Sequence, residues 1–346
     1  MVKVLIVDDS AFMRNTISSM IDGDPDLEVI GMARDGIEAI DKVASLKPDI
    51  VTLDVEMPRM DGIEALKHIM SKTPVPVLMV SSITTEGAEV TLDALDIGAI
   101  DFIPKNLADL SINIVKIKEI LVDKLKSIGR KGLVRQKPLK LSKPLEMPTP
   151  TQYASHRKTG IVAIGSSTGG PKALQLILSN IPKDFPVPIV IAQHMPSAFT
   201  GPFAERLNQL SQMEVKEAED GEPLKKGMVF IAPGGKHMGV KRKKITESSI
   251  HISDDNGKYI YKPSADYLML SVPETYSGQA LGVILTGLGN DGTQGMKEIK
   301  NRGGRTIAES EESCVVYGMP KSVVEAGVAD KVVTLDEIAG EIINAV

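Results

Sequence analysis

The sequence predicts an α/β protein of two domains, each built on a mostly parallel, doubly wound sheet. Two observations lead to this fold class. Short apolar runs recur along both halves of the chain and alternate with stretches of helical periodicity, the pattern of parallel strands covered by helices. Between the halves, residues 129–159 lose this pattern and carry prolines at positions 138, 144, 148 and 150. Closely spaced prolines favour an extended chain, so this segment is expected to join two separate domains.

Five strands and five helices are expected in the first half. The apolar runs that predict the strands are residues 2–7, 27–33, 49–53, 76–80 and 99–103. The helical patterns between and after them are Ala11–Ile21, Ile37–Ser45, Ile63–Met70, Ala88–Ile97 and about Ser111–Ile128. Strands that alternate with helices in this way form a parallel sheet with helices on both faces.

The second half shows the same alternation with one insert of a different kind. Strands are expected at residues 161–165, 188–193, 229–233, 280–287, 306–308 and 331–334. Residues 236–262 instead show short alternating runs and the turn signal Asp255-Asn256-Gly257, which predict a β-hairpin.

These patterns place the first domain at residues 1–121, a linker at 122–158 and the second domain at 159–346. The stretch from Val122 to Gly160 holds ten Lys and Arg residues against two acids, although the whole chain carries a net charge of −5. Two acidic domains joined by a basic connector lack the charge of a nucleic-acid-binding protein. Nucleic acid is therefore not expected as a partner.

Cysteine content and the first residues indicate the compartment. The single cysteine, Cys314, leaves no intramolecular disulfide and no Cys-x-x-Cys metal site, which agrees with a reducing environment. The start MVKVLIVDDS lacks the basic and apolar regions of a secretory signal, and no apolar run reaches the roughly 18 residues of a membrane span. We expect a cytoplasmic protein that is not inserted in a membrane.

Polar residues follow the strands of the first domain, where ligands of parallel sheets bind. Asp8 and Asp9 follow the first strand, Asp54 the third, Ser81 the fourth and Lys105 the fifth. Carboxylates that converge at one sheet edge repel one another, and a hard cation such as Mg²⁺ relieves that repulsion. A hydroxyl and a lysine beside the ion supply what a phosphoryl group requires. Asp54 is therefore the candidate phosphoacceptor.

Any one of these acids is more simply explained as a helix cap, as Asp9 could be for the next helix. The joint pattern D-D-S, D-x-E-M-P-x-M-D-G and F-I-P-K is more specific. It closely resembles the receiver domain of two-component response regulators, a five-stranded flavodoxin-like fold, over roughly residues 1–120. The resemblance implies Mg²⁺ ligands at Asp8, Asp9, Asp54 and the backbone carbonyl of Glu56, and phosphoryl or switch contacts at Ser81, Phe102 and Lys105.

The chain departs from the receiver pattern after the lysine. The family lysine is usually followed by a proline in a cis peptide bond, whereas here Asn106 follows Lys105 and Pro104 precedes it. The departure affects the local geometry of this loop and leaves the acidic cluster unchanged.

Ser167 is the candidate nucleophile of the second domain. It lies in Gly165-Ser-Ser-Thr-Gly169, which reads G-x-S-x-G between an expected strand and an expected helix. Such a turn exposes its middle serine in many hydrolases. The alternative is a plain glycine-rich turn or a phosphate loop, but the G-K-[ST] of a P-loop and the G-x-G-x-x-G of a dinucleotide site are both missing.

A serine nucleophile needs a base within hydrogen-bond reach. His194 directly follows the strand at 188–193, at the same sheet edge as Ser167, and is our candidate base. His237 remains a possible substrate contact, and His251 is expected on a solvated strand face. The two other histidines are at positions 68 and 156, in a helix of the first domain and in the linker.

Asp291 is the candidate third member. It lies in Gly289-Asn-Asp-Gly292 after the strand at 280–287, again at the carboxyl edge. An acid there orients the histidine and stabilises its cationic form. Taken alone, Asp291 could as well cap the helix that follows.

The order Ser, His, Asp disfavours an ordinary α/β-hydrolase, whose order is Ser, Asp, His. Residues 160–346 instead resemble the catalytic domain of the chemotaxis protein-glutamate methylesterases, the CheB family. The shared motifs include G-S-S-T-G-G, Q-H-M-P at 193–196, I-A-P-G at 231–234, G-N-D-G at 289–292 and S-C-V-V-Y-G-M-P at 313–320. The resemblance implies catalysis by Ser167, His194 and Asp291, and oxyanion or substrate contacts at Thr168, Gly169 and Leu288, where Leu288 replaces a usual methionine.

The resemblance also implies the biology. The expected reaction is hydrolysis of glutamate methyl esters, and deamidation of glutamines, on chemoreceptors (methyl-accepting chemotaxis proteins) during adaptation. A chemotaxis histidine kinase is the implied phosphodonor, Mg²⁺ is needed only for receiver phosphorylation, and the esterase needs no cofactor. The unphosphorylated receiver is expected to cover the edge that carries Ser167.

Two other functions stay open at the level of sequence. One is a receiver with a non-catalytic scaffold output domain, which would not need Ser167, His194 and Asp291 at three strand ends. The other is a broad serine esterase for small molecules, which turnover of nitrophenyl esters would reveal.

Overall fold

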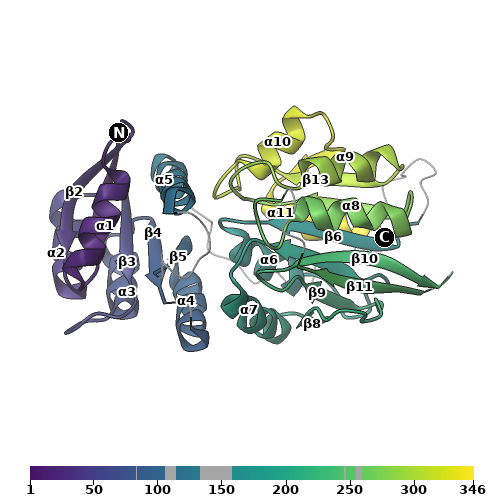
Figure 1. The fold of residues 1–346 in the computed structure, drawn as a ribbon, viewed down its shortest axis with the longest axis horizontal. Helices are drawn as coiled ribbons and strands as arrows, with labels where there is room; N and C mark the ends of the chain where they lie inside the picture. Colours follow the sequence, from purple (N-terminus) through teal and green to yellow (C-terminus); the bar gives the residue numbers. More distant parts are fainter. Residues whose placement is uncertain (83, 106–113, 133–157, 245–246, 255–258) are drawn as a thin grey trace. The chain divides into compact units, whose positions relative to one another are not determined.

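The chain folds into two compact units, Met1–Arg135 and Gln136–Val346. The structure is a computed structural model that describes residues 1–346 except 83, 106–113, 133–157, 245–246 and 255–258 (Figure 1). Asn106, most of the expected linker and His156 lie outside the described residues.

The first unit has the predicted five-stranded parallel sheet, in the order β2-β1-β3-β4-β5. Its central strands are apolar and buried on both sides, because helices cover both faces. The strands are β1 (Val2–Val7), β2 (Leu27–Ala33), β3 (Ile50–Asp54), β4 (Val77–Ser81) and β5 (Asp101–Pro104).

Polar caps determine where the helices of this unit begin. The side chains of Ser10, Asp35, Asp61 and Thr84 each accept a hydrogen bond from a backbone N–H in the first turn of the helix that follows. The helices are α1 (Ala11–Ile21), α2 (Gly36–Leu46), α3 (Gly62–Lys72), α4 (Thr85–Ile97) and α5 (Ile114–Lys131). Helix α5 thus continues beyond residue 121, where the sequence pattern placed the end of the first domain.

The second unit contains a seven-stranded sheet in the order β14-β13-β12-β6-β7-β9-β8, and all its strand pairs are parallel. The predicted α/β class is confirmed for both units. The strands are β6 (Ile161–Ser166), β7 (Ile189–Gln193), β8 (Glu214–Glu217), β9 (Met228–Ile231), β12 (Ala280–Ile284), β13 (Arg305–Glu309) and β14 (Lys331–Val333). Strand β8 was not predicted, because only one of its four residues is apolar.

The predicted β-hairpin is present, but its turn is not where the sequence signal placed it. Strands β10 (His237–Lys244) and β11 (Glu247–Ser253) pair antiparallel and connect through residues 245–246. The signal Asp255-Asn256-Gly257 follows the second strand and lies outside the described residues. Apolar side chains of the hairpin, Met238 and Ile250, join the core of this unit.

Six helices of the second unit are described, and three of them position the candidate site. Helix α6 follows β6, α8 packs on the hairpin, and α9 packs beside α8 and follows β12 (Figure 1). The helices are α6 (Gly170–Ser179), α7 (Ser197–Leu210), α8 (Ala265–Thr275), α9 (Thr293–Asn301), α10 (Met319–Glu325) and α11 (Leu335–Asn344). Among the residues that the structure describes, no helix is both long and apolar enough to cross a bilayer.

Candidate functional site

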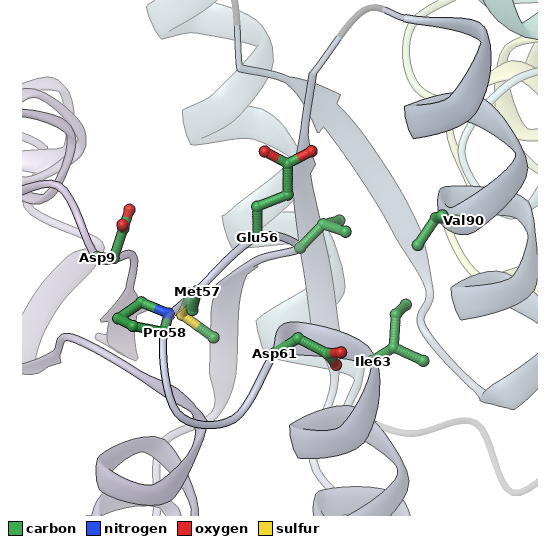
Figure 2. A pocket seen from close by; sticks show the side chains of 8 residues that line it. Asp9, Glu56, Met57, Pro58, Asp61, Ile63 and Val90 are labelled. Atoms are coloured by element: carbon green, nitrogen blue, oxygen red, sulfur yellow. The ribbon is translucent and has the colours of Figure 1, made fainter.

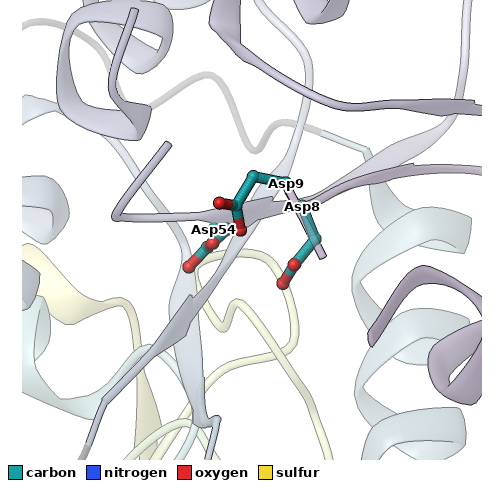
Figure 3. Close-up of side chains that lie close together, drawn as sticks. All are labelled: Asp8, Asp9 and Asp54. Carbon is teal, nitrogen blue, oxygen red and sulfur yellow. The ribbon is translucent and has the colours of Figure 1, made fainter. Parts of the chain in front are cut away.

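Three carboxylates meet at the carboxyl edge of the first sheet, as the sequence indicated. Asp8 and Asp9 follow β1 and Asp54 ends β3, and one oxygen of each lies within 4.8 Å of the others (Figure 3). Asp8 and Asp54 are buried, whereas Asp9 is exposed. The cluster therefore concentrates negative charge at the sheet edge, with two of its three carboxylates shielded from water.

Lys105 neutralises part of that charge. Its Nζ lies 2.6 Å from Asp54 Oδ2 and 3.5 Å from Asp8 Oδ2. Burial nevertheless raises the pKa of Asp54 to about 6, because the ion pair with Lys105 does not fully offset desolvation and the charge of Asp8. Burial likewise raises the pKa of Asp8. The buried Asp8 Oδ2 accepts no hydrogen bond within the described part of the chain, and an all-oxygen cluster with excess negative charge fits a hard divalent cation.

The loop after Asp54 is held close to the acceptor by a glycine. A Cβ at Gly62, the first residue of α3, would overlap the backbone oxygen of Asp54, and the Gly62 N–H donates to Val55 O at 2.9 Å. Glu56 lies in this loop, and its backbone N–H donates to the Asp54 carboxylate. The D-G of the sequence motif therefore has a packing reason.

A pocket of about 490 Å³ opens beside the acidic cluster. Asp9 belongs to the cluster and also lines the pocket (Figure 2). Its wall combines apolar and acidic side chains from the loop after β3, from α3 and from α4. The lining residues are Asp9, Val55, Glu56, Met57, Pro58, Asp61, Ile63 and Val90. A group that enters this pocket contacts the acidic cluster at Asp9.

The two other predicted switch positions are both buried. Ser81 Oγ lies 2.6 Å from Thr91 Oγ1 of α4 and 3.3 Å from the Gly87 carbonyl oxygen. Phe102 is only 6% exposed. Ser81 is therefore bonded to α4 in this conformation, and sequence reasoning did not identify Thr91 because its contact is made across the tertiary fold.

Ser167 lies in a sharp turn between β6 and α6. Gly169 has φ +79°, which favours glycine, and an added Cβ there would lie 2.7 Å from Val315. The Ser167 N–H donates to Thr286 O at 3.0 Å, and Gln193 Nε2 donates to Ser167 O at 2.9 Å. The backbone of the turn is thus fixed from both neighbouring strands, while the Ser167 side chain is partly exposed.

His194 lies beside that turn because β6 and β7 pair in register. Ser166 pairs with Gln193, and the His194 N–H donates to Ser166 O at 3.0 Å. The ring Nε2 lies 2.7 Å from Asp291 Oδ2. The other ring nitrogen, Nδ1, is buried and has no hydrogen-bond partner in the part of the chain that the structure describes. A ring held at Nε2 with a free Nδ1 can take a proton at Nδ1.

Asp291 accepts hydrogen bonds from the N-terminus of α8 as well as from His194. Ser264 Oγ and the backbone N–H groups of Ala265 and Asp266 donate to it at 2.8, 2.7 and 3.0 Å. Burial acts to raise the pKa of Asp291, but these donors and His194 outweigh it, so the pKa lies below its ordinary value. Asp291 is therefore ionised at neutral pH.

Asp266 in turn accepts a hydrogen bond from the N-terminus of the neighbouring helix α9. It lies in the first turn of α8, and its Oδ1 accepts the N–H of Gly295 in the first turn of α9 at 2.8 Å. Burial raises its pKa to about 6, and the nearby charge of Asp291 adds to that effect. Asp291, which precedes α9, thus caps α8, and Asp266, which belongs to α8, caps α9. No local signal in the sequence singled out Asp266 or Ser264.

Thr168 and Leu288, which are predicted oxyanion or substrate positions, lie on two loops that are linked through Thr286. Thr286 Oγ1 donates to Thr168 O at 2.8 Å and accepts the Val316 N–H at 2.9 Å. Thr168 Oγ1 is buried and accepts or donates no hydrogen bond among the described residues. Leu288 is half-buried, and the preceding Gly287 O accepts the Met319 N–H at 2.9 Å. The two loops are therefore braced against each other.

The alternative histidines do not join this group. His237 is completely buried and stacks on Tyr267, with ring centroids 4.7 Å apart, so it is not available as a substrate contact. His251 Nδ1 lies 3.4 Å from Asp220 Oδ1 on the outer part of the hairpin, in agreement with the expected solvated face. His194 is the histidine that the fold brings to Ser167.

The chain was compared with known proteins. Residues 162–342 match the family described as CheB methylesterase, and residues 4–114 match the response regulator receiver domain. A protein-glutamate methylesterase/protein-glutamine glutaminase of Nitratidesulfovibrio vulgaris is 48% identical, and the match covers 99% of each chain. One of Halalkalibacterium halodurans is 47% identical over 99% of this chain and 98% of its own. The crystal structure of the CheB methylesterase catalytic domain of Thermotoga maritima is 45% identical, covers 55% of this chain and 100% of its own, and has a TM-score of 0.53.

Proposed function

The chain belongs to the CheB methylesterase family, and we propose that Ser167, His194 and Asp291 are the residues through which it hydrolyses glutamate methyl esters and glutamine amides of chemoreceptors. The observation that carries this proposal is the hydrogen bonding of the two ring nitrogens of His194. Its Nε2 is paired with an ionised Asp291, and its buried Nδ1 is unpaired among the described residues, one strand away from Ser167.

In the proposed mechanism the Ser167 oxygen attacks the ester carbonyl carbon while Nδ1 of His194 takes the hydroxyl proton. Asp291 stabilises the imidazolium that forms. Backbone N–H groups near Thr168, Gly169 and Leu288 are proposed to hold the negative oxygen of the tetrahedral intermediate. The C–O bond to the methoxy group then breaks, and His194 returns the proton so that methanol leaves.

Water completes the cycle by the same route. It attacks the acyl-enzyme carbonyl and gives one proton to His194. The bond between the Ser167 oxygen and the carbonyl carbon then breaks, His194 passes its proton to that oxygen, and the glutamic acid that forms loses its remaining acid proton to solvent. A glutamine side chain would react in the same way and release ammonia. Because its amide is a poorer leaving group, deamidation is expected to be slower.

The test of this mechanism is methanol release from receptor membranes methylated beforehand. Ser167→Ala is expected to lose at least about a thousandfold in kcat, as other serine hydrolases do when the nucleophile is removed. Ser179→Ala is the matched control, because Ser179 is an exposed serine of α6 whose hydroxyl donates to the Leu176 carbonyl oxygen of its own helix. Methanol release by Ser167→Ala at the rate of the control would refute the assignment.

The first domain is proposed to regulate the second through phosphorylation of Asp54 by a chemotaxis histidine kinase. Asp8, Asp9, Asp54 and the backbone carbonyl of Glu56 would hold Mg²⁺, which supplies positive charge to a phosphoryl group on Asp54. Lys105, already 2.6 Å from Asp54, would contact that group together with Ser81. Because chemoreceptors present their methylated helices to the cytoplasm, the chain is proposed to act there.

Regulation is tested with a phosphoryl analogue. Beryllofluoride with Mg²⁺ is expected to raise methanol release by the wild-type chain and to leave Asp54→Asn at its basal rate. Equal stimulation of both proteins, or of neither, would contradict control through Asp54.

A further inference from the structure

One short segment, residues 261–266, contacts both His194 and Asp291. At its start, the Tyr261 ring stacks on the His194 ring, with centroids 4.1 Å apart and planes inclined by 15°. At its end, Ser264 and the N–H groups of residues 265 and 266 hold the Asp291 carboxylate. The face of the histidine and the acid that orients it are therefore positioned by the same piece of chain.

The hydrogen bond to Asp291 does not fix the His194 ring by itself. The last torsion of a histidine side chain has a broad energy minimum, so a ring bonded only at Nε2 can rock about that bond. Rocking would change the direction in which Nδ1 points. A second ring stacked on its face opposes this motion, because rocking would break the stacking contact.

The stack also differs in strength between the two protonation states of His194. When His194 takes the proton of Ser167, its ring becomes a cation that lies over the face of an aromatic ring. Such a contact favours the cationic form by about 5- to 30-fold when it is partly shielded from water. Since the cation forms only during the reaction, this stabilisation acts on the transition state more than on the resting enzyme.

We propose that Tyr261 is a positioning residue of the hydrolytic site: its ring fixes the His194 ring with Nδ1 toward Ser167 and stabilises the imidazolium. The inference rests on the proposed function and extends it to a residue outside the Ser, His, Asp set. Tyr261 is only partly buried and is not a member of the apolar core cluster of its unit. Its neighbour Ile260 is 74% exposed. Tyr261 therefore contributes to the site and is not part of that core cluster, whereas Ala265, at the other end of the segment, is buried in it.

Two substitutions separate the ring from the hydroxyl. Tyr261→Phe keeps the stacked ring and is expected to retain kcat within about twofold. Tyr261→Leu keeps apolar volume without a ring and is expected to lower kcat by about 5- to 30-fold with little change in KM, as loss of a contact of this strength predicts. Ile260→Ala is the control for disturbance of the segment and is expected to keep the wild-type kcat.

The inference is overturned if Tyr261→Leu keeps the wild-type kcat. It is equally overturned if Tyr261→Phe is as impaired as Tyr261→Leu, since the hydroxyl and not the ring would then matter.

A spectroscopic readout makes the test independent of activity. The ring current of Tyr261 should shift the ring protons of His194 upfield in the NMR spectrum, and the chain has only five histidines to resolve. The shift should persist in Tyr261→Phe and vanish in Tyr261→Leu. An upfield shift in a wild-type chain that releases no methanol would refute the proposed function and leave the stack intact, whereas methanol release with no such shift would refute the inference alone.

Discussion

At the scale of single residues, the pKa of a buried aspartate is shifted in opposite directions at the two sites. Burial raises the pKa of Asp54 to about 6 despite its contact with Lys105. Burial also acts on Asp291, but the N-terminus of α8 and His194 hold its pKa below the ordinary value. The number of N–H donors decides the outcome. Asp291 is thereby an anion that holds the His194 ring, whereas the buried charge of Asp54 is best compensated by a cation or by a covalent modification.

Asp266→Asn is expected to change the pH dependence of stability. The folded-state pKa of Asp266 is about 6, above its ordinary value of 3.8, so the folded chain binds this proton more tightly than the unfolded chain does. The stability that Asp266 contributes is full below about pH 4 and is lost as the pH rises through about 6. The variant cannot titrate at this position. The free energy of unfolding of the variant, relative to that of the wild type, should therefore increase by about 1–2 kcal/mol between pH 4 and pH 7, with allowance for solvent screening.

The measurement is the melting temperature of both proteins across this pH range. Asp291 and His194 are present in both, so the difference between the two curves isolates Asp266. Parallel curves would show that Asp266 does not carry the raised pKa.

The residues at the candidate hydrolytic site were predictable to the extent that they end strands. Ser167, His194 and Asp291 follow β6, β7 and β12, and the rule that parallel strands present their carboxyl ends at one edge brings them together. Tyr261 and Asp266 follow no such strand. Their contacts with His194 and Asp291 depend on how α8 packs, which no local pattern records.

At the scale of elements, α4 is hydrogen-bonded to Ser81, the residue whose hydroxyl is proposed to contact the phosphoryl group. Ser81 Oγ interacts with Thr91 Oγ1 and with the carbonyl oxygen of Gly87, both on α4. If Ser81 contacts the phosphoryl group as proposed, these interactions must break first. Phosphorylation would then release the first turns of α4.

Thr91→Val is therefore expected to make the receiver bind a phosphoryl analogue more tightly. It removes a ground-state hydrogen bond worth about 1 kcal/mol, which corresponds to roughly a fivefold gain in apparent affinity for beryllofluoride with Mg²⁺. Calorimetric titration of the full chain measures this affinity. Thr91→Ser keeps the hydroxyl and should behave as wild type, and an unchanged or weaker affinity in Thr91→Val would exclude a restraining role for Thr91.

Elements with strong apolar patterns were predicted well, and two features without them were not. Strand β8 lies at the edge of the sheet and contains mostly charged residues, so only its pairing with β9 defines it. The hairpin turn was assigned to the Asn-Gly signal, although β10 and β11 already meet between Lys244 and Glu247. A turn signal shows that a turn is possible and does not show which strands it joins.

At the scale of the whole molecule, each unit contains its own sheet and its own candidate site. Residues 159 and 160 of the second unit contact segments far along the chain. Thr159 Oγ1 donates to Ala345 O near the C-terminal end of the unit, and the Gly160 N–H donates to Gln279 O, directly before β12, at 2.7 Å. These contacts support our proposal that the second domain begins near residue 159.

A fragment of residues 158–346 is expected to fold, to keep methanol release and to give no response to beryllofluoride. A fragment that starts at residue 162 lacks Thr159 and Gly160 and is expected to melt at a lower temperature. Circular dichroism and the methanol assay measure both properties. A response of the longer fragment to beryllofluoride would contradict regulation through the receiver.

The pairing of β6 with both β7 and β12 has a consequence for how the enzyme is made. His194 and Asp291 are 97 residues apart in the chain, and β12 must dock beside β6 before they can meet. Contacts between distant segments form late, because the entropy of closing a long loop must be lost before these contacts contribute stability. If Ser167 is the nucleophile as proposed, it stays inactive in a nascent chain until β12 and Asp291 have been synthesised, and recovery of activity during refolding should report the docking of β12.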